Sequence, residues 1–224
     1  MTDTPQTLAA RVVLRPIGGP LPLGMAGLAI ASFVTSGLEL HWIVSSQAVD
    51  VGLILVSVPF ILQLLACVFS YLARDGAAGS LLAVVSTTWL GMGLIRIVST
   101  PGKVSGALGL LLVAAGALLA LCAPAVGRAK PLPALVFLAA AVRFGLAGVY
   151  ELSGTSAWQN ASGVVGLAVV GLACYSMLAF ELEDQSRAAV LPTFRRGQGA
   201  ASLNGGVDVQ LDRVINEAGV RQTS

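Results

Sequence analysis

Four ionisable residues stand inside or beside long apolar stretches of the sequence. Arg143 lies near the middle of the fifth stretch and Glu151 toward its end, and Glu39 and Arg96 lie toward the ends of the first and third stretches. A charge in apolar surroundings is costly unless it is paired or hydrated, so each residue indicates a helix contact or a functional site. Two interpretations stay open. One is an ion pair of Glu39 with Arg96 or Arg143 that fixes helices together; the other is a positively charged station for an anion in a hydrated vestibule.

Neutral polar residues form a second set. Gln63 and the run Ser86–Trp89 place hydrogen-bonding groups within apolar stretches. Such groups usually bond between helices, but a line of hydroxyl groups also suits a narrow polar path. Pro59 lies inside the second stretch and can kink a helix there, because proline lacks a backbone N–H group.

The sequence lacks the usual catalytic and metal-binding patterns. His41 is the only histidine and has no Ser or Cys partner at a useful spacing, so we interpret it as a polar residue near a membrane interface, beside Trp42. The cysteines are scattered through apolar runs without CxxC or Cys/His spacing, which is typical of small packing residues. We therefore expect no enzyme, no metal site and no cofactor. The cysteines are Cys67, Cys122 and Cys174.

The composition indicates a membrane protein. The chain has 224 residues, of which 56% are hydrophobic and only 11% are charged. A soluble domain carries roughly 25% charged residues, so most of this surface must face lipid. The net charge of +2 is too small to indicate a nucleic-acid partner.

The apolar runs predict an all-α bundle of six transmembrane helices with short loops. Each run has roughly 20 residues, enough to cross about 30 Å of hydrocarbon, and continuous runs exclude a β-barrel. We expect a polar tail over 1–20 without a cleaved signal peptide, a membrane domain over 21–184 and a C-terminal tail over 185–224. The six spans are expected at about 22–44, 50–73, 79–98, 105–126, 132–152 and 161–182.

The positive charges predict the orientation. With six spans, both tails and the second and fourth loops share one side, which carries eight Arg and Lys residues, whereas the opposite side carries Lys103 and, near a span end, Arg96. Because cytoplasmic loops are enriched in Lys and Arg, we expect both termini in the cytoplasm and the protein in the plasma membrane. The eight residues are Arg11, Arg15, Arg74, Arg128, Lys130, Arg187, Arg195 and Arg196.

A short amphipathic helix is predicted in the C-terminal tail, ending before Gly219. It is interpreted either as a partner-binding helix or as a loosely ordered tail that lies on its own protein or on lipid. Its apolar face would contain Val207, Leu211, Val214, Ile215 and Ala218.

Three features together resemble the acetate uptake transporter family, which includes the bacterial succinate–acetate permease. Gly19-Pro-Leu-Pro-Leu-Gly24 is similar to the family's Asn-Pro-x-Pro-Leu-Gly motif. The end of the sixth span, Tyr175–Glu183, followed by Val190-Leu-Pro192, is similar to the family's acidic helix end and Val-Leu-Pro tail. The third feature is the layout of six short-looped spans with a Gln in the second. The resemblance covers about residues 18–195 and implies a carboxylate transporter that forms hexameric rings.

The resemblance also implies which residues line the pore, although this sequence differs from the family pattern at several of these positions. Gly19 replaces the motif's Asn, and the family's bulky constriction positions match Leu28, Ser86 and Ala140, of which only the first is bulky. Either the pore is wider, or Phe144 or Trp89 narrows it, or the alignment is shifted. The candidate pore and substrate-binding residues are Pro20, Pro22, Leu23, Gly24, Leu28, Glu39, Ser86, Thr87, Trp89, Arg96, Ala140 and Arg143.

The motif at the first span has a physical rationale. Pro20 and Pro22 suit the leading edge of a helix because they donate no backbone hydrogen bond. Gly24 leaves the backbone open at the first turn, where N–H groups and the positive end of the helix dipole attract a carboxylate. An entry turn that only packs explains the same residues equally well.

The predicted function is a transporter or channel for small monocarboxylates such as acetate, with succinate as a further candidate substrate, and transport is either passive or proton-linked. Glu39 could share a proton with the substrate. Two alternatives are a channel for a small neutral solute such as urea or an amide, and a membrane scaffold that acts through its C-terminal tail. The expected partners are the lipid bilayer, the carboxylate, protons and further copies of the chain, which would meet at small-residue faces. Examples of these faces are Gly27/Ala31, Ala141/Gly145 and Ser162/Gly166.

Overall fold

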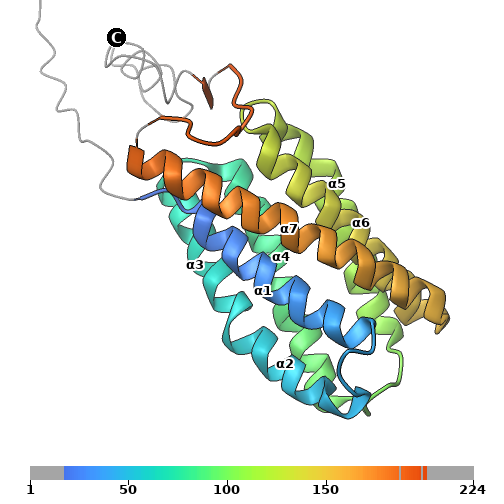
Figure 1. Cartoon of the computed structure of the whole chain (residues 1–224). Helices are drawn as coiled ribbons and strands as arrows, with labels where there is room; N and C mark the ends of the chain where they lie inside the picture. The colour runs from blue at the N-terminus through green and yellow to red at the C-terminus, as the bar shows by residue number, and fades with distance from the viewer. Residues whose placement is uncertain (1–17, 187, 198, 201–224) are drawn as a thin grey trace, which may run out of the picture.

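The computed structural model describes residues 18–186, 188–197 and 199–200. Within them the long elements are all helices, and six helical segments are long and apolar enough to cross a membrane. The chain is therefore an all-α, multi-pass membrane protein, as predicted (Figure 1). The elements are α1 (Leu21–Glu39), η1 (Ser45–Gln47), α2 (Ala48–Ser57), α3 (Pro59–Leu72), α4 (Gly76–Val98), α5 (Gly106–Gly127), α6 (Pro131–Ser153) and α7 (Ser156–Ser186).

The six spans form a closed ring in chain order. Each span packs against the next, with α2 and α3 together forming the second span, and α7 packs against α1 to close the ring. Two ends are named here for the loops they carry. The tail end carries Gly18, turns 73–75 and 128–130, and the segment after α7; the far end carries loops 40–47, 99–105 and 154–155.

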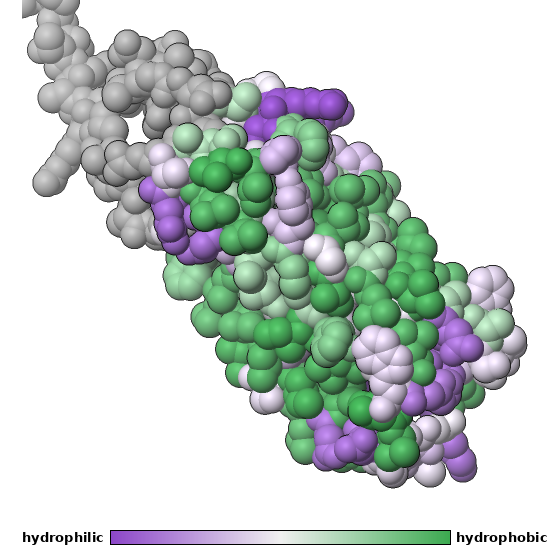
Figure 2. Space-filling view, in the orientation of Figure 1, coloured by the Kyte–Doolittle hydropathy of each residue, from purple (hydrophilic) through white to green (hydrophobic). Residues whose placement is uncertain are grey.

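The outer surface of the ring is apolar. Large hydrophobic side chains such as Leu110, Leu121 and Val164 expose more than half of their area. Figure 2 shows apolar residues over the middle of the visible face, with hydrophilic patches toward its two ends. This distribution is unfavourable in water and is the one expected for a bundle surrounded by lipid.

The second span is broken in the middle, at the proline identified in the sequence. Helix α2 ends at Ser57, Val58 leaves the regular helix with φ −118° and ψ −74°, and Pro59 begins α3. Proline cannot donate the hydrogen bond that would continue α2, and it fits the first position of a new helix. The break lies against α1, because a Cβ atom added to Gly27 would lie 3.2 Å from the Pro59 carbonyl oxygen.

The small-residue faces at Gly27/Ala31 and Ser162/Gly166 are occupied within the chain, so the prediction that they lie between protomers is wrong. At the Ala141/Gly145 face Ala141 is buried, whereas the side of Gly145 that a Cβ would occupy is open. Gly27 packs against α3, where an added Cβ would lie 2.8 Å from Gln63 Cγ. A Cβ added to Gly116 of α5 would lie 2.8 Å from the Ala141 carbonyl oxygen and 3.2 Å from the Gly145 nitrogen. Small side chains allow close backbone approach, and here they serve neighbouring helices of one chain.

The third face is likewise internal. Ser162 is buried, and its hydroxyl group donates to the Arg143 carbonyl oxygen at 3.4 Å. A Cβ added to Gly166 would lie 2.5 Å from Arg143 Nε. This face of α7 is therefore filled by α1 and α6 of the same protomer.

Two helices differ in length from the predicted spans. Helix α1 was expected to reach residue 44 but ends at Glu39, because His41 takes a left-handed conformation with φ 60°. The Trp42 N–H group then donates to the Gly37 carbonyl oxygen at 2.8 Å, a common way to close a helix. Helix α7 is longer than expected, from Ser156 to Ser186. The predicted amphipathic stretch 207–218 lies outside the described residues.

Candidate functional site

Arg143 lies buried inside the ring, where α1, α4 and α6 meet. Its Nη2 atom donates to Thr35 Oγ1 at 2.6 Å and to the two carboxylate oxygens of Glu39 at 3.3 and 3.2 Å. The Arg143 side chain is 1% exposed and that of Glu39 is 5% exposed. Of the pairings left open by the sequence, Glu39 therefore takes Arg143. A buried charge without a partner is strongly unfavourable, so the pair stabilises the bundle whatever else it does.

Two aromatic side chains enclose the guanidinium group. The Arg143 Cζ atom lies 5.5 Å from the centre of the Trp89 ring, within the range of a cation–π contact. Trp89 and Phe144 pack edge to face, with ring centres 5.0 Å apart, and both are fully buried. The centre of the ring thus combines one cation with a bulky apolar wall.

These aromatic residues stand one turn from the constriction positions expected by resemblance. Ser86 and Ala140 are buried but small, whereas Trp89 is three residues after Ser86 and Phe144 is four residues after Ala140. Residues three and four apart share a helix face, so Trp89 and Phe144 supply bulk on the same faces, displaced along the helices. Leu28 is buried as well.

Several buried donors at this centre have no hydrogen-bond partner within the described part of the chain. They are Arg143 Nε and Nη1 and Trp89 Nε1, together with the Ser36 hydroxyl group. Buried polar groups are normally satisfied, and a carboxylate ligand would accept from such donors. Arg143 Nε and Ser36 lie against Gly166, where there is no room even for a methyl group, which leaves Nη1 and Trp89 Nε1 as the unsatisfied donors away from that contact.

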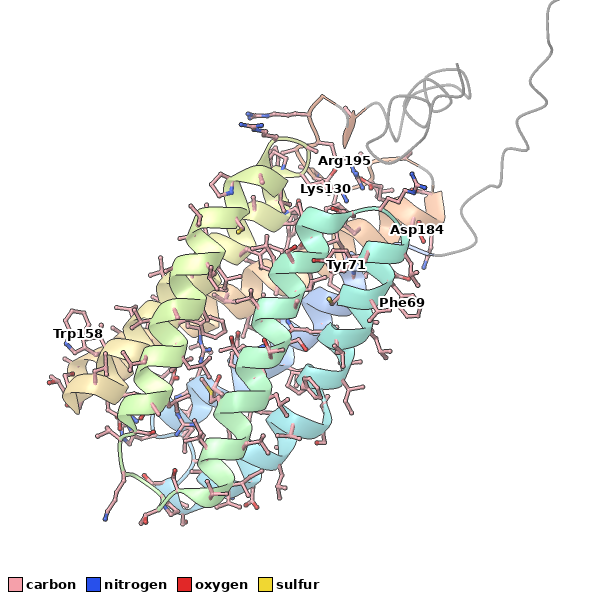
Figure 3. All side chains as sticks on the ribbon, turned by 180° about the vertical axis from the view of Figure 1, so that it is seen from behind. Phe69, Tyr71, Lys130, Trp158, Asp184 and Arg195 are labelled. Atoms are coloured by element: carbon pink, nitrogen blue, oxygen red, sulfur yellow. The ribbon has the colours of Figure 1, made fainter. Side chains whose placement is uncertain are left out.

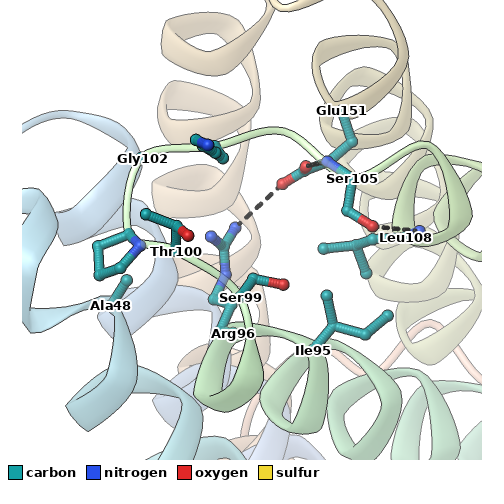
Figure 4. Close-up of a pocket in the computed structure, with 11 residues that line it drawn as sticks. Ala48, Ile95, Arg96, Ser99, Thr100, Gly102, Ser105, Leu108 and Glu151 are labelled. Atoms are coloured by element: carbon teal, nitrogen blue, oxygen red, sulfur yellow. Dashed lines mark hydrogen bonds and ion pairs between the residues drawn. The ribbon is translucent and has the colours of Figure 1, made fainter.

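A second charged pair lies at the far end. Arg96 Nη2 pairs with Glu151 Oε1 at 3.5 Å, and the Ser105 N–H group donates to Glu151 Oε2 at 2.8 Å. Of the two pairings left open for Glu39, the one with Arg96 is therefore not formed, because Arg96 pairs with Glu151. The pair borders a small hollow of about 20 Å³, also lined by Lys103 and Thr100, which is roughly the room for one water molecule (Figure 4).

Gly24 does not present free N–H groups to a ligand. Its own N–H group donates to the Pro20 carbonyl oxygen at 3.2 Å, and its carbonyl oxygen accepts from Gln63 Nε2 at 3.1 Å. An added Cβ would lie 2.6 Å from Leu82 Cδ2. The contacts therefore match the packing interpretation, with Pro20 at the N-cap of α1 and both Pro22 and Leu23 half-buried in its first turn.

The expected line of hydroxyl groups is not continuous. The Ser86 hydroxyl group donates to the Phe60 carbonyl oxygen at 3.1 Å, next to the break in the second span. Thr87 is exposed on the outside of α4 and bonds back to the Ala83 carbonyl oxygen at 2.8 Å. The Ser86 hydroxyl group therefore links α4 to α3, and the Thr87 hydroxyl group bonds to the backbone of its own helix.

Among the predicted site residues, the structure brings together Glu39, Trp89 and Arg143, and it places Arg96 apart with Glu151. The sequence analysis missed Thr35 and the role of Gly166 as a site neighbour. Thr35 precedes Glu39 by four residues, so their shared helix face was a usable signal.

Comparison with known proteins agrees with this architecture. The bacterial acetate channel SatP has a similar structure, with a TM-score of 0.70 and 18% sequence identity over 79% of this chain and 99% of SatP. No curated protein matches the chain. The sequence profile of the GPR1/FUN34/yaaH family matches residues 2–195. The chain belongs to the GPR1/FUN34/yaaH family.

Proposed function

We propose that this protein moves small carboxylates through the middle of each protomer, with the monocarboxylate acetate as the primary substrate and the dicarboxylate succinate as a second candidate. The observation that carries the proposal is the buried Arg143 guanidinium group, which retains unsatisfied donors beside Trp89 and Phe144. Family membership and the fold shared with an acetate channel support it.

The arrangement replaces part of the hydration that a small carboxylate loses on leaving water. A bare carboxylate in hydrocarbon faces a prohibitive desolvation cost. Arg143 offers a charge and its free Nη1 donor, while Trp89 and Phe144 provide an apolar wall for the methyl group. The incoming carboxylate would compete with Glu39 for the guanidinium group.

This competition gives a route to proton linkage. Glu39 is buried and contacts Arg143 through a single guanidinium nitrogen. When a substrate carboxylate takes its place beside Arg143, the two carboxyl groups would share one proton, because two negative charges beside a single cation repel each other. One proton would then accompany one carboxylate.

We further propose that the protein lies in the plasma membrane with both termini in the cytoplasm. Five described Arg and Lys residues lie at the tail end, whereas Lys103 and Arg96 lie toward the far end. This asymmetry favours a cytoplasmic tail end. The five residues are Arg74, Arg128, Lys130, Arg195 and Arg196.

We also propose a homo-oligomer, with the hexameric ring implied by the resemblance as the first candidate. Because the Gly27/Ala31 and Ser162/Gly166 faces are filled within the chain, contacts between protomers would use the apolar outer surface, including the open side of Gly145. Native mass spectrometry of the detergent-solubilised protein would give the number of copies.

The decisive experiment is uptake into liposomes that contain the purified full chain, with acetate, succinate and urea compared at two pH values. Acetate flux above that of empty liposomes, rising with an inward proton gradient, supports the proposal. The neutral-solute alternative is favoured by one observation, the internal neutralisation of Arg143 by Glu39. Urea flux that ignores pH and membrane potential would select that alternative.

A further inference from the structure

The chain after α7 folds back across the tail end instead of leaving the bundle. Residues 188–197 contain no long helix, and Figure 1 shows this segment running from the end of α7 toward α5 and α6. Thr193 is only 2% exposed, and Leu191 packs against the buried core. The Tyr175 hydroxyl group of α7 donates to the Pro192 carbonyl oxygen at 3.1 Å. The segment is therefore held in a defined position.

One buried acid of α7 holds most of the segment. Arg195 binds Glu183 with two nitrogens, Nε to Oε2 at 2.9 Å and Nη2 to Oε1. The Thr193 hydroxyl group donates to the same Oε2 at 3.1 Å, and the Arg195 guanidinium group lies 5.3 Å from the centre of the Phe180 ring. Two-point binding of a carboxylate by Arg is strong and directional, so Glu183 is the anchor.

The other end of the segment is tied to the turn between α5 and α6. The Arg196 N–H group donates to the Ala129 carbonyl oxygen at 3.1 Å. The next residue of that turn, Lys130, pairs with Asp75, and Asp75 caps the N-terminus of α4. Figure 3 shows Lys130 and Arg195 at this same end of the bundle. Contacts thus run from α7 through the segment to α6 and on to α4.

We propose that residues 190–197, called here the clasp, form a gate that closes the tail end of the path and opens when Arg195 leaves Glu183. This inference rests on the proposed function, because a gate needs a path. The clasp is irregular backbone, so it can swing away without breaking the hydrogen bonds of any span. Its only charged tie among the described contacts is the Arg195–Glu183 ion pair near the end of the bundle, and the remaining ties, from Tyr175, Thr193 and the Arg196 N–H group, are single hydrogen bonds.

The test compares two neutralising substitutions in the full chain in liposomes. Arg195→Gln removes the cation from Glu183 and is expected to raise acetate flux about tenfold, the effect of losing a charged hydrogen bond that favours the closed state. Asp184→Asn is the control, because this exposed neighbour of the anchor also loses one charge, and its flux should match that of the native chain. The exchanged pair Glu183→Arg with Arg195→Glu should return flux toward the native value.

A second measurement reports on the clasp even if the protein carries no acetate. A thiol introduced by Thr193→Cys, in a chain with the three native cysteines replaced by Ala, should react slowly with a membrane-impermeant maleimide, because this position is 2% exposed. Adding Arg195→Gln should accelerate labelling about tenfold, whereas adding Asp184→Asn should not. Unchanged labelling and unchanged flux in the Arg195→Gln variant would overturn the gate. Faster labelling without any acetate flux would keep the clasp and reject the transport proposal.

Discussion

Removal of the central charge is the perturbation that best separates support of the bundle from transport. Arg143→Gln deletes the cation but leaves Glu39 buried, with its carboxylate deprived of the ion pair. Breaking a buried pair by removing one partner costs about 3–5 kcal/mol, so we expect a clearly lower melting temperature in detergent. This loss alone would say nothing about transport.

The double variant Glu39→Gln with Arg143→Gln resolves the ambiguity. It removes both charges and leaves two neutral amides that can bond to each other and to Thr35, so we expect most of the lost stability to return. The site for an anion, however, stays absent. A carboxylate about 4 Å from a guanidinium group gains about 4 kcal/mol at an effective dielectric constant of about 20. Because each 1.4 kcal/mol is a factor of ten, acetate flux should fall roughly a thousandfold.

The assay is paired thermal unfolding and liposome uptake for the native chain, both single variants and the double variant. Urea is measured in parallel as the neutral solute, because any urea flux would not need a cation and should not change with Arg143. A double variant that is as stable as the native chain and still carries acetate at the native rate would refute the reasoning, and Arg143 would then be only a structural residue.

Three further substitutions test neighbouring contacts. Gly166→Ala places a Cβ 2.5 Å from Arg143 Nε, so it should displace the guanidinium group and lower both acetate flux and melting temperature. Gly171→Ala is the control on the same helix, because its added Cβ would have no atom within 4 Å, and it should leave flux unchanged. Arg96→Gln should lower the stability in thermal unfolding by about 1–3 kcal/mol, which is less than the loss expected for Arg143→Gln. The reason is that the Arg96 side chain is 17% exposed and Glu151 still accepts from the Ser105 N–H group. A loss of stability equal to or larger than that of Arg143→Gln would contradict this account. Gln63→Met removes the bond to the Gly24 carbonyl oxygen and should lower the stability by about 1 kcal/mol, and a change of several kcal/mol would mean that this contact has been underestimated.

The six spans could be predicted because the hydrophobicity of a continuous run can be read from the sequence without knowing the contacts of the helix. A run of about 20 apolar residues reports on the solvent around it, whichever neighbours the helix has. The break at Pro59 was predictable for the same reason, since the missing N–H group is a property of the residue itself.

The partners of the charged residues could not be predicted with the same confidence. The sequence left Glu39 open to a pair with Arg96 or with Arg143, and the structure pairs Glu39 with Arg143 and Arg96 with Glu151. Depth along a span follows from counting residues, but the direction of a side chain depends on how each helix is rotated against its neighbours. That rotation is decided by packing across the whole ring.

The glycines show a similar limit. Gly166 could be assigned to a close helix contact from its type and spacing, but its spacing could not say whether the partner helix belongs to the same chain.

The constriction residues show another limit of the sequence, because Trp89 and Phe144 lie on the same helix faces as Ser86 and Ala140, one turn further along. An ungapped alignment therefore identifies the helix face on which a residue lies more securely than its position along the helix.

The central claim is that a substrate carboxylate binds the Arg143 guanidinium group inside the bundle. The most direct measurement is solid-state NMR of the full chain in lipid, with ¹³C-carboxyl acetate and ¹⁵N-guanidinium arginine. We predict a dipolar contact between the acetate carboxyl carbon and a guanidinium nitrogen, present in the native chain and absent in Arg143→Lys. A contact that persists in Arg143→Lys, or acetate transport with no such contact in the native chain, would contradict the account.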